Sequence, residues 1–354
     1  MSTLAIAGGT SPSLGRAIVA AVFAQTSWNV LILSRSTRPP IWLRAIDQDA
    51  KRHKIAAVDY HSVHSLATVL KSHGVHTLIS VTSAVDGTQA QTQINLLEAA
   101  ISAGCKRFAP SQWGFGPTGW DEVESLKWGN QGVREECDKH QNQIEIAYFN
   151  HGSFMNYIGH GIFTTPEPED TADEALAKYK AGKGYKKGED AACEGLHRQG
   201  PLADQSGAYL VGLKNSIAEL PVKDDGQWPR ITFTSMTDVG KFVAAALDLP
   251  KWEKELSMAG DTLSMGELLA SAESVTGKKF KVTPLRRQDL LERLANTSHD
   301  DFMARLWIEF NLAYIRDRDD EVVLRPTLNR LCPTVKPVSV HEYMEKHWQE
   351  SLGY

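Results

Sequence analysis

A glycine-containing turn near the N-terminus places the strongest constraint on the fold. An apolar run at residues 4–7 ends at Gly8 and Gly9, and a helical pattern begins near Leu14 and Gly15. In a dinucleotide-binding sheet, such a turn lets backbone N–H groups and the helix N-terminus approach a pyrophosphate. The middle glycine of the usual spacing is missing, so an ordinary tight turn of another α/β protein is the alternative. The residues expected to contact the cofactor are Gly8, Gly9, Thr10, Ser11, Ser13, Leu14 and Gly15.

The end of the second apolar run selects the cofactor. Residues 28–33 are apolar apart from Asn29, and residues 34–38 then read Ser-Arg-Ser-Thr-Arg with no acidic side chain. An NAD site places a carboxylate here for the ribose 2′-OH, whereas an NADP site needs cations for the 2′-phosphate. We therefore predict NADP(H), with Arg35 as the main phosphate ligand and Arg38 beside it. The alternative is a solvated basic turn.

Strand and helix patterns alternate through the first half of the chain. Short strand patterns at residues 4–7, 30–33, 54–60, 77–81, 107–110 and 144–149 alternate with helical patterns. Such alternation implies a parallel sheet with helices on both faces. The predicted fold class is α/β, a Rossmann-type doubly wound parallel sheet with a smaller C-terminal α/β substrate lobe.

The pattern changes after about residue 160, which sets the predicted domain boundary. Residues 1–155 are expected to form the NADP-binding domain, with residues of about 230–260 packing back on it. Residues 156–354 are expected to form the substrate lobe, including further helices at 262–276, 288–295 and 339–351. A charged insertion at about residues 164–205 reads either as a lid or as a passive solvated loop.

Composition excludes several classes of partner. The net charge of −5 gives no basic field for nucleic acid or an anionic membrane. No apolar run approaches the roughly 20 residues of a membrane span. The first strand begins so near Met1 that no room is left for a signal peptide, so we expect a cytoplasmic protein. The four cysteines are scattered without metal-ligand spacing, which predicts free thiols and no metal site.

Residues just after each strand are the site candidates, because ligands of such sheets bind beyond the carboxyl ends of the strands. Asp59, after the third strand, is expected near adenine. Thr82 and Ser83, after the fourth, are expected to approach the cofactor's ribose and pyrophosphate. Ser111 and Gln112, after the fifth, are placed to hydrogen-bond a substrate carbonyl or the carboxamide.

Aromatic residues and a histidine follow the fifth and sixth strands. Trp113 and Phe115 are expected to form a wall for a hydrophobic substrate, with core packing as the alternative. His151 follows the sixth strand, and its near-neutral pKa suits proton transfer or a hydrogen bond to substrate. A satisfied structural histidine is the alternative there. The side chains expected to line the same cavity are Phe154, Met155 and Tyr157.

Four segments together resemble one family. They are Gly-Gly-Thr at 8–10 with Leu-Gly at 14–15, Leu-Ser-Arg-Ser-Thr at 33–37, residues 106–114 (KRFAPSQWG) and residues 150–155 (NHGSFM). The chain resembles the NmrA-like and isoflavone-reductase-like branch of the atypical short-chain dehydrogenases, and its fungal secondary-metabolite tailoring members in particular. This resemblance implies a Rossmann domain that binds NADP(H) and a cleft that holds the nicotinamide against a substrate lobe.

One departure from that family concerns its catalytic lysine. The resemblance implies a helical lysine four residues before an arginine, here Arg134, acting as general acid/base or positioning the nicotinamide ribose. Asn130 occupies that position, and Lys127 lies three residues earlier. If residues 126–139 are helical, Lys127 and Asn130 share a face and Lys127 reaches the same space. A solvated lysine is the alternative.

Three functions stay open at this point. The leading one is an NADP(H)-dependent oxidoreductase that changes a C=C or C=N bond of a hydrophobic aromatic or alkaloid-like small molecule. The second is an NADP(H)-using cyclase or isomerase, in which transient redox is coupled to an intramolecular cycloaddition of the Diels–Alder type. The third is a non-catalytic NADP-sensing regulator.

Overall fold

The computed structural model describes most of the chain. The described residues are 2–47, 49–83, 87–158, 161, 163–165, 197–199, 202 and 209–348. The predicted insertion at about 164–205 falls almost wholly outside these residues.

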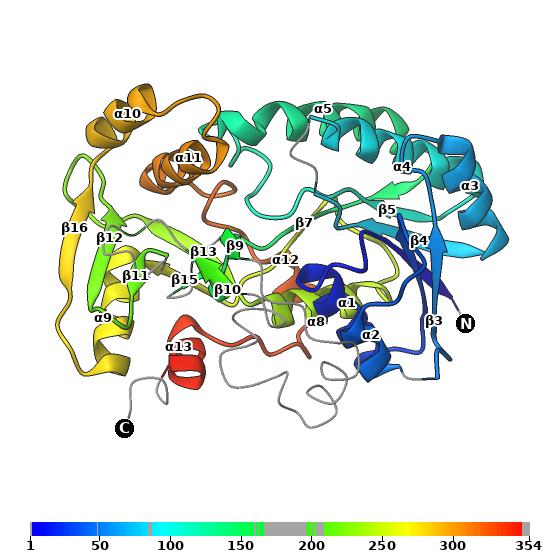
Figure 1. Cartoon of the computed structure of the whole chain (residues 1–354), viewed down its shortest axis with the longest axis horizontal. Coiled ribbons are helices and arrows are strands. Elements are labelled where there is room, and N and C mark those ends of the chain that lie inside the picture. Colours follow the sequence, from blue (N-terminus) through cyan, green and yellow to red (C-terminus); the bar gives the residue numbers. More distant parts are fainter. Residues whose placement is uncertain are drawn as a thin grey trace.

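A six-stranded parallel sheet organises the N-terminal half (Figure 1). Its strands follow the order β3-β2-β1-β4-β5-β6. Their bounds are β1 (Thr3–Ala7), β2 (Asn29–Ser34), β3 (His53–Ala57), β4 (Val75–Ser80), β5 (Arg107–Ala109) and β6 (Glu145–Ile146). The order reverses between β1 and β4, and ligands of open α/β sheets bind at such a switch point. The predicted Rossmann-type doubly wound sheet is therefore confirmed.

Helices cover both faces of this sheet (Figure 1). Along β1, Leu4 and Ile6 enter one hydrophobic cluster while Ala5 and Ala7 enter the other, because successive strand side chains point to opposite faces. The helices are α1 (Leu14–Gln25), α2 (Ile41–Ile46) and α8 (Met236–Ala246) on the first face, and α3 (Val63–Ser72), α4 (Gln89–Ala103) and α5 (Glu124–His140) on the second.

Helix α8 packs against α1 although the two lie far apart in sequence. A Cβ atom built on Gly240 would lie 2.3 Å from the carbonyl oxygen of Ala17, so the helices meet at a glycine. Buried residues of α8 share one hydrophobic cluster with those of α1 and β1. Segments after residue 230 thus complete the core around the sheet, while the domain boundary itself stays a prediction.

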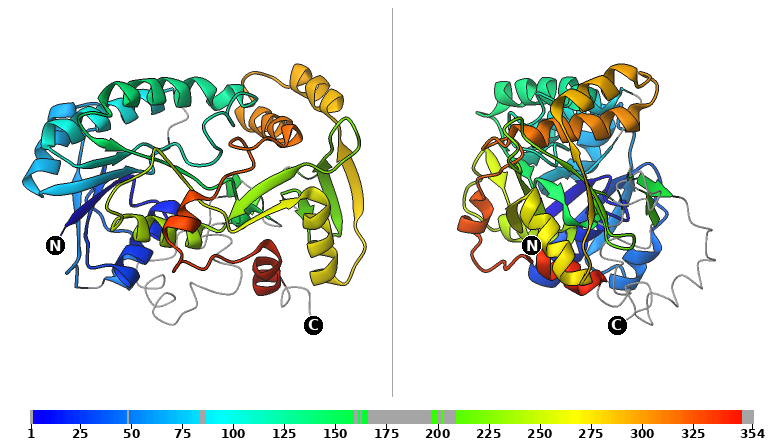
Figure 2. Two further views of the ribbon diagram at one scale, coloured as in Figure 1. Left: turned by 180° about the vertical axis from the view of Figure 1, so that it is seen from behind. Right: turned by 90° about the vertical axis from the view of Figure 1, so that its left-hand side faces the viewer.

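Smaller sheets and helices form the other end of the molecule, opposite the N-terminus in Figure 2. In one sheet β12 (Ile217–Pro221) lies between β11 (Val211–Gly212) and β16 (Lys281–Leu285), and in another β13 (Arg230–Thr234) lies between β15 (Asp261–Ser264) and β8 (Ser153–Phe154). The remaining strands are β7 (Tyr148–Asn150), which pairs with β14 (Glu255–Ser257), and β9 (Phe163–Thr165), which pairs with β10 (His197–Gln199). The helices here are η1 (Met155–Tyr157), α9 (Met265–Thr276), α10 (Arg287–Asn296), α11 (Phe302–Arg316) and α13 (Val340–Trp348). Helix α12 (Thr327–Leu331) instead packs beside α8 and β14, in the hydrophobic cluster of the large sheet.

Three local predictions differ from the structure. The single strand expected at 144–149 is two strands, because β7 leaves the large sheet after Ala147 and pairs with β14. The helix expected from residue 262 begins at Met265, because Asp261–Ser264 pairs with β13 and the Ser264 side chain then caps the helix. Helix α11 was not predicted.

Three further expectations concern membrane-spanning helices, metal ligands and cysteines. Within the described part of the chain, no helix has the length and apolar character needed to cross a membrane. The same residues contain no cluster of ligands suited to a metal ion. Cys105, Cys137 and Cys332 are buried free thiols, and Cys193 lies outside the described residues.

Candidate functional site

The turn after β1 depends on glycine at position 8. Gly8 has a φ of +76°, a region that favours glycine, and a Cβ atom there would lie 3.1 Å from the Thr82 nitrogen. Its N–H donates to the carbonyl of Leu33 (3.1 Å) and to the hydroxyl of Tyr60 (3.0 Å). The ends of β1, β2 and β4 therefore meet at this residue.

The N-terminus of α1 opens directly from that turn. No side chain caps the helix at Ser13, whose hydroxyl instead pairs with that of Ser11 at 2.8 Å. A Cβ atom on Gly15 would lie 3.0 Å from the Gly9 carbonyl oxygen, so glycine keeps the turn and the helix close together. Uncapped N–H groups and the helix dipole attract an anion here. Thr10 is half-buried within the turn, and Leu14 packs into the core.

Arg35 and Arg38 lie on an exposed turn directly after β2. The Ser34 hydroxyl accepts from the Ser36 N–H (3.4 Å), and the Ser36 hydroxyl accepts from the Arg38 N–H (3.2 Å). Within the described residues, neither guanidinium has an ion-pair partner. The turn starts beside Leu33, which contacts Gly8, so both cations lie at the same edge of the sheet as the Gly8 turn.

Tyr60 joins the first two strands. Its hydroxyl donates to the Leu33 carbonyl (2.8 Å) while accepting from the Gly8 N–H. Burial raises the pKa of this phenol to about 12, an effect that the nearby Arg35 charge opposes. Asp59 is exposed, and its carboxylate accepts from the His61 N–H at 2.9 Å. The structure thus uses Tyr60 to hold the turn, a role that the sequence did not reveal.

A hydrogen-bond network ties the ends of β4 and β5 together. The Thr82 hydroxyl accepts from Gln93 (2.8 Å), and the Thr82 carbonyl accepts from Gln89 (2.9 Å) and from the Ser111 hydroxyl (2.7 Å). Gln93 also accepts from the Ser111 N–H at 2.8 Å. The donor of Ser111 is therefore engaged in holding the edge of the sheet. Ser83 is exposed beside it.

Three of the side chains expected to contact substrate lie in packed surroundings. The Trp113 indole stacks on Phe149, with 5.5 Å between ring centroids, and donates to the Ser80 carbonyl. Phe115 is buried against Trp120 and the α11 side of the core, and Met155 is fully buried. Phe115 and Met155 are thus core residues, whereas Trp113 is only partly buried, and its contact with a substrate stays a prediction. Phe154 and Tyr157 are half-buried.

Helix α5 carries the two candidates for the family's lysine position. Lys127 is half-buried, and its side chain has no hydrogen bond or ion pair with the described residues. Asn130 donates to the Leu126 carbonyl (3.1 Å), and its own carbonyl accepts from the Gln112 side chain. The helical prediction for residues 126–139 is confirmed, so Lys127 lies about one turn from Asn130 on the same face.

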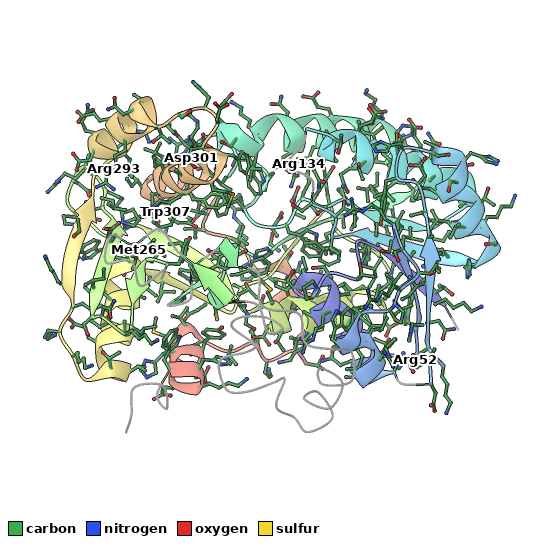
Figure 3. The ribbon with its side chains drawn as sticks, in the orientation of Figure 1. Arg52, Arg134, Met265, Arg293, Asp301 and Trp307 are labelled. Atoms are coloured by element: carbon green, nitrogen blue, oxygen red, sulfur yellow. The ribbon has the colours of Figure 1, made fainter. Side chains whose placement is uncertain are left out.

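Arg134, labelled in Figure 3, lies in the C-terminal half of α5. It links this helix to the β7–β14 pair. Its guanidinium contacts Glu255 at 2.7 Å and lies 3.8 Å from the centroid of the Tyr148 ring. Glu255 also accepts from the Asn150 side chain at 2.8 Å. This ion pair fixes the helix that carries Lys127 relative to the strand that precedes His151.

His151 follows β7 and is buried. Its ring stacks on Phe154 with 3.8 Å between centroids, and neither ring nitrogen has a partner among the described residues. Burial lowers the pKa of the imidazole to about 3. The expected near-neutral pKa is therefore wrong, and the ring is neutral at physiological pH.

Comparisons with known proteins agree with this geometry. No family model matches the chain. It is 29% identical to oxidoreductase BOA1 of Botryotinia fuckeliana over 284 residues, which cover 79% of this chain and 78% of that protein. It is 25% identical to oxidoreductase swnN of Metarhizium robertsii over 289 residues, which cover 80% and 76%. The names of these fungal relatives bear out the predicted class of enzyme.

Solved structures show the same fold. AtPrR2 with NADP+ and (+)pinoresinol has a TM-score of 0.67 at 18% identity, covering 97% of this chain and 98% of its own. Leucoanthocyanidin reductase from Vitis vinifera with NADPH has a TM-score of 0.63 at 17% identity, covering 98% and 99%. Both of those structures contain a nicotinamide cofactor, and the similarity shows that this chain shares their fold.

Proposed function

We propose that the chain is an NADP(H)-dependent oxidoreductase that acts on a hydrophobic aromatic or alkaloid-like small molecule. The observation that carries the proposal is the pairing of an uncapped α1 N-terminus with two unpaired arginines at the adjoining strand end. The residues present fit the cofactor, because the turn has backbone N–H donors for a pyrophosphate and the Arg35 guanidinium has paired N–H donors for a 2′-phosphate.

The residues of the turn and of β2 would hold the cofactor. Gly8, Gly9 and Gly15 keep the backbone close to the pyrophosphate, and Arg35 with Arg38 binds the 2′-phosphate. Asp59 would bind near the adenine, and Thr82 and Ser83 would bind near the ribose and pyrophosphate. When bound, NADPH supplies the hydride.

Lys127 is our candidate for the proton that accompanies the hydride. It is half-buried on the first turns of α5 and has no other partner among the described residues. A lysine one turn from the family position reaches the same space from a different backbone atom. His151 is neutral, so it does not deliver a proton as an imidazolium.

The half-buried rings of Phe154 and Tyr157 support a hydrophobic substrate. They lie edge to face, with 5.5 Å between their centroids, directly after His151 in the chain. We propose that a C=C or C=N bond is reduced or formed, in secondary-metabolite biosynthesis. A cyclase that uses the cofactor transiently is a second candidate, favoured by the asparagine in place of the family lysine; the same substitution suits a non-catalytic NADP-sensing regulator.

The test follows deuterium from [4-²H]NADPH through a panel of conjugated enones and cyclic imines. An oxidoreductase consumes NADPH, measured by absorbance, and places deuterium in the product, measured by mass spectrometry. Product formed without net loss of NADPH would favour the cyclase. Tight NADPH binding with no product from any substrate would favour the regulator and contradict the main proposal.

A further inference from the structure

The imidazole of His151 is a buried polar group that the described residues leave unsatisfied. The residue is 3% exposed, and neither Nδ1 nor Nε2 has a hydrogen-bond partner among them. Burying a polar group without a hydrogen-bond partner destabilises the folded state, because its bonds to water are not replaced. Such a group in a folded protein calls for an explanation, and a bound ligand that supplies the missing hydrogen bonds is one.

The backbone around this ring is held rigidly. The His151 N–H donates to the Gly114 carbonyl (2.9 Å), and its carbonyl accepts from the Thr234 hydroxyl (2.8 Å). The next residue, Gly152, has a φ of +71°, and a Cβ atom there would lie 2.1 Å from the Thr232 carbonyl oxygen. These contacts fix the backbone of His151, while both nitrogens of its ring have no partner among the described residues.

The side chain of Gln112, which lies near His151 through Gly114, carries a second buried polar atom without a partner in the described part of the chain. The side-chain oxygen of Gln112 is buried without a partner, while its nitrogen donates to the Asn130 carbonyl. Gln112 lies two residues before Gly114, which contacts His151 directly. Both groups follow the carboxyl ends of β5 and β7, on the opposite side of the switch point from the Arg35 turn. The nicotinamide half of a dinucleotide lies on that side.

We propose that His151 hydrogen-bonds the carboxamide of the bound nicotinamide. The inference rests on the proposed function, since it requires NADP(H) at this site. A neutral imidazole has one donor and one acceptor, and an uncharged carboxamide offers the matching oxygen and NH₂. The Phe154 ring stacks on one face of the imidazole and leaves the ring plane, in which both nitrogens would form hydrogen bonds, uncovered by that contact.

The first test observes the ring in the wild-type protein. Histidine side chains labelled with ¹⁵N are followed by NMR, and the His151 signals are assigned by their absence from His151→Phe. We expect NADP+ to shift both His151 nitrogens and 2′,5′-ADP, which lacks the nicotinamide, to leave them unchanged. Equal responses to the two ligands, or none, would overturn the inference. Failure of 2′,5′-ADP to bind would overturn the proposed function as well.

The second test compares affinity with stability. His151→Phe removes two unsatisfied nitrogens, so we expect a thermal midpoint equal to or above that of the wild type. We expect its Kd for NADP+ to rise about 3- to 10-fold, with the Kd for 2′,5′-ADP unchanged. His151→Asn, which keeps a donor and an acceptor, should recover part of the loss, and the exposed His64→Phe is the matched control. A purely structural histidine would give the opposite pattern, with a lower midpoint and an unchanged Kd.

Discussion

Removal of the Tyr60 hydroxyl tests whether that group holds the phosphate-binding turn. In Tyr60→Phe the Leu33 carbonyl loses one donor and the Gly8 N–H loses one acceptor. Each hydrogen bond contributes about 1 kcal/mol net, and Gly8 keeps its second acceptor at 3.1 Å. We therefore expect the free energy of unfolding to fall by about 1–2 kcal/mol. Because the turn loosens, the Kd for NADPH should rise as well.

The pH dependence of that variant supplies an independent check. Burial raises the pKa of Tyr60 to about 12 from its ordinary value of 10. Its contribution to stability is thus complete below pH 10 and is lost as the pH rises through 12. Between those values the wild type should lose up to about 1.4 kcal/mol per pH unit more than Tyr60→Phe. Urea unfolding followed by tryptophan fluorescence measures both effects. Equal stability, parallel pH profiles and unchanged NADPH binding would refute the reasoning.

Three further predictions concern the packing around the site. Arg134→Met should lower the free energy of unfolding by about 2–3 kcal/mol, because it leaves the partly buried Glu255 without its cation. Adding Glu255→Leu should recover part of that loss, measured by urea unfolding. Additive effects of the two substitutions would argue against coupling between the residues. Gly240→Ala should lower stability by about 1–3 kcal/mol through its clash with α1, and an unchanged thermal midpoint would contradict that close approach. Phe154→Ala should raise the pKa of His151 from about 3 toward its ordinary value, since burial is the main cause of the depression; a ring that still fails to titrate by NMR would show that other groups cover it.

Local pattern was enough to predict the N-terminal sheet. Its strands are apolar runs that end in polar residues, and the glycines at 8 and 15 have steric reasons visible in the structure. The break after Ala147 had no such signal, because residues 146–149, which span the end of β6 and the start of β7, are all apolar. Only pairing with β14, more than 100 residues later, separates them.

Helix α11 was missed for a related reason. Its buried residues include the consecutive run Leu306, Trp307, Ile308 and Glu309, so the apolar positions do not follow a single helical stripe. The same limit applies to the site. Sequence order placed Thr82, Ser111 and His151 after strands, but their hydrogen-bond partners and their burial come from segments distant in the chain. Phe115 followed a strand too, and tertiary packing placed it in the core, while Trp113 stacks on Phe149 and is partly buried.

The account depends most directly on NADP(H) binding through Arg35. Fluorescence titrations of NADPH and NADH with the wild type, Arg35→Ala and the exposed control Arg293→Ala measure this binding. We predict tight binding of NADPH and weak binding of NADH by the wild type, an NADPH affinity at least 10-fold lower in Arg35→Ala, and no change in Arg293→Ala. Equal affinities for the two cofactors, or an Arg35→Ala variant that still prefers NADPH, would contradict the account.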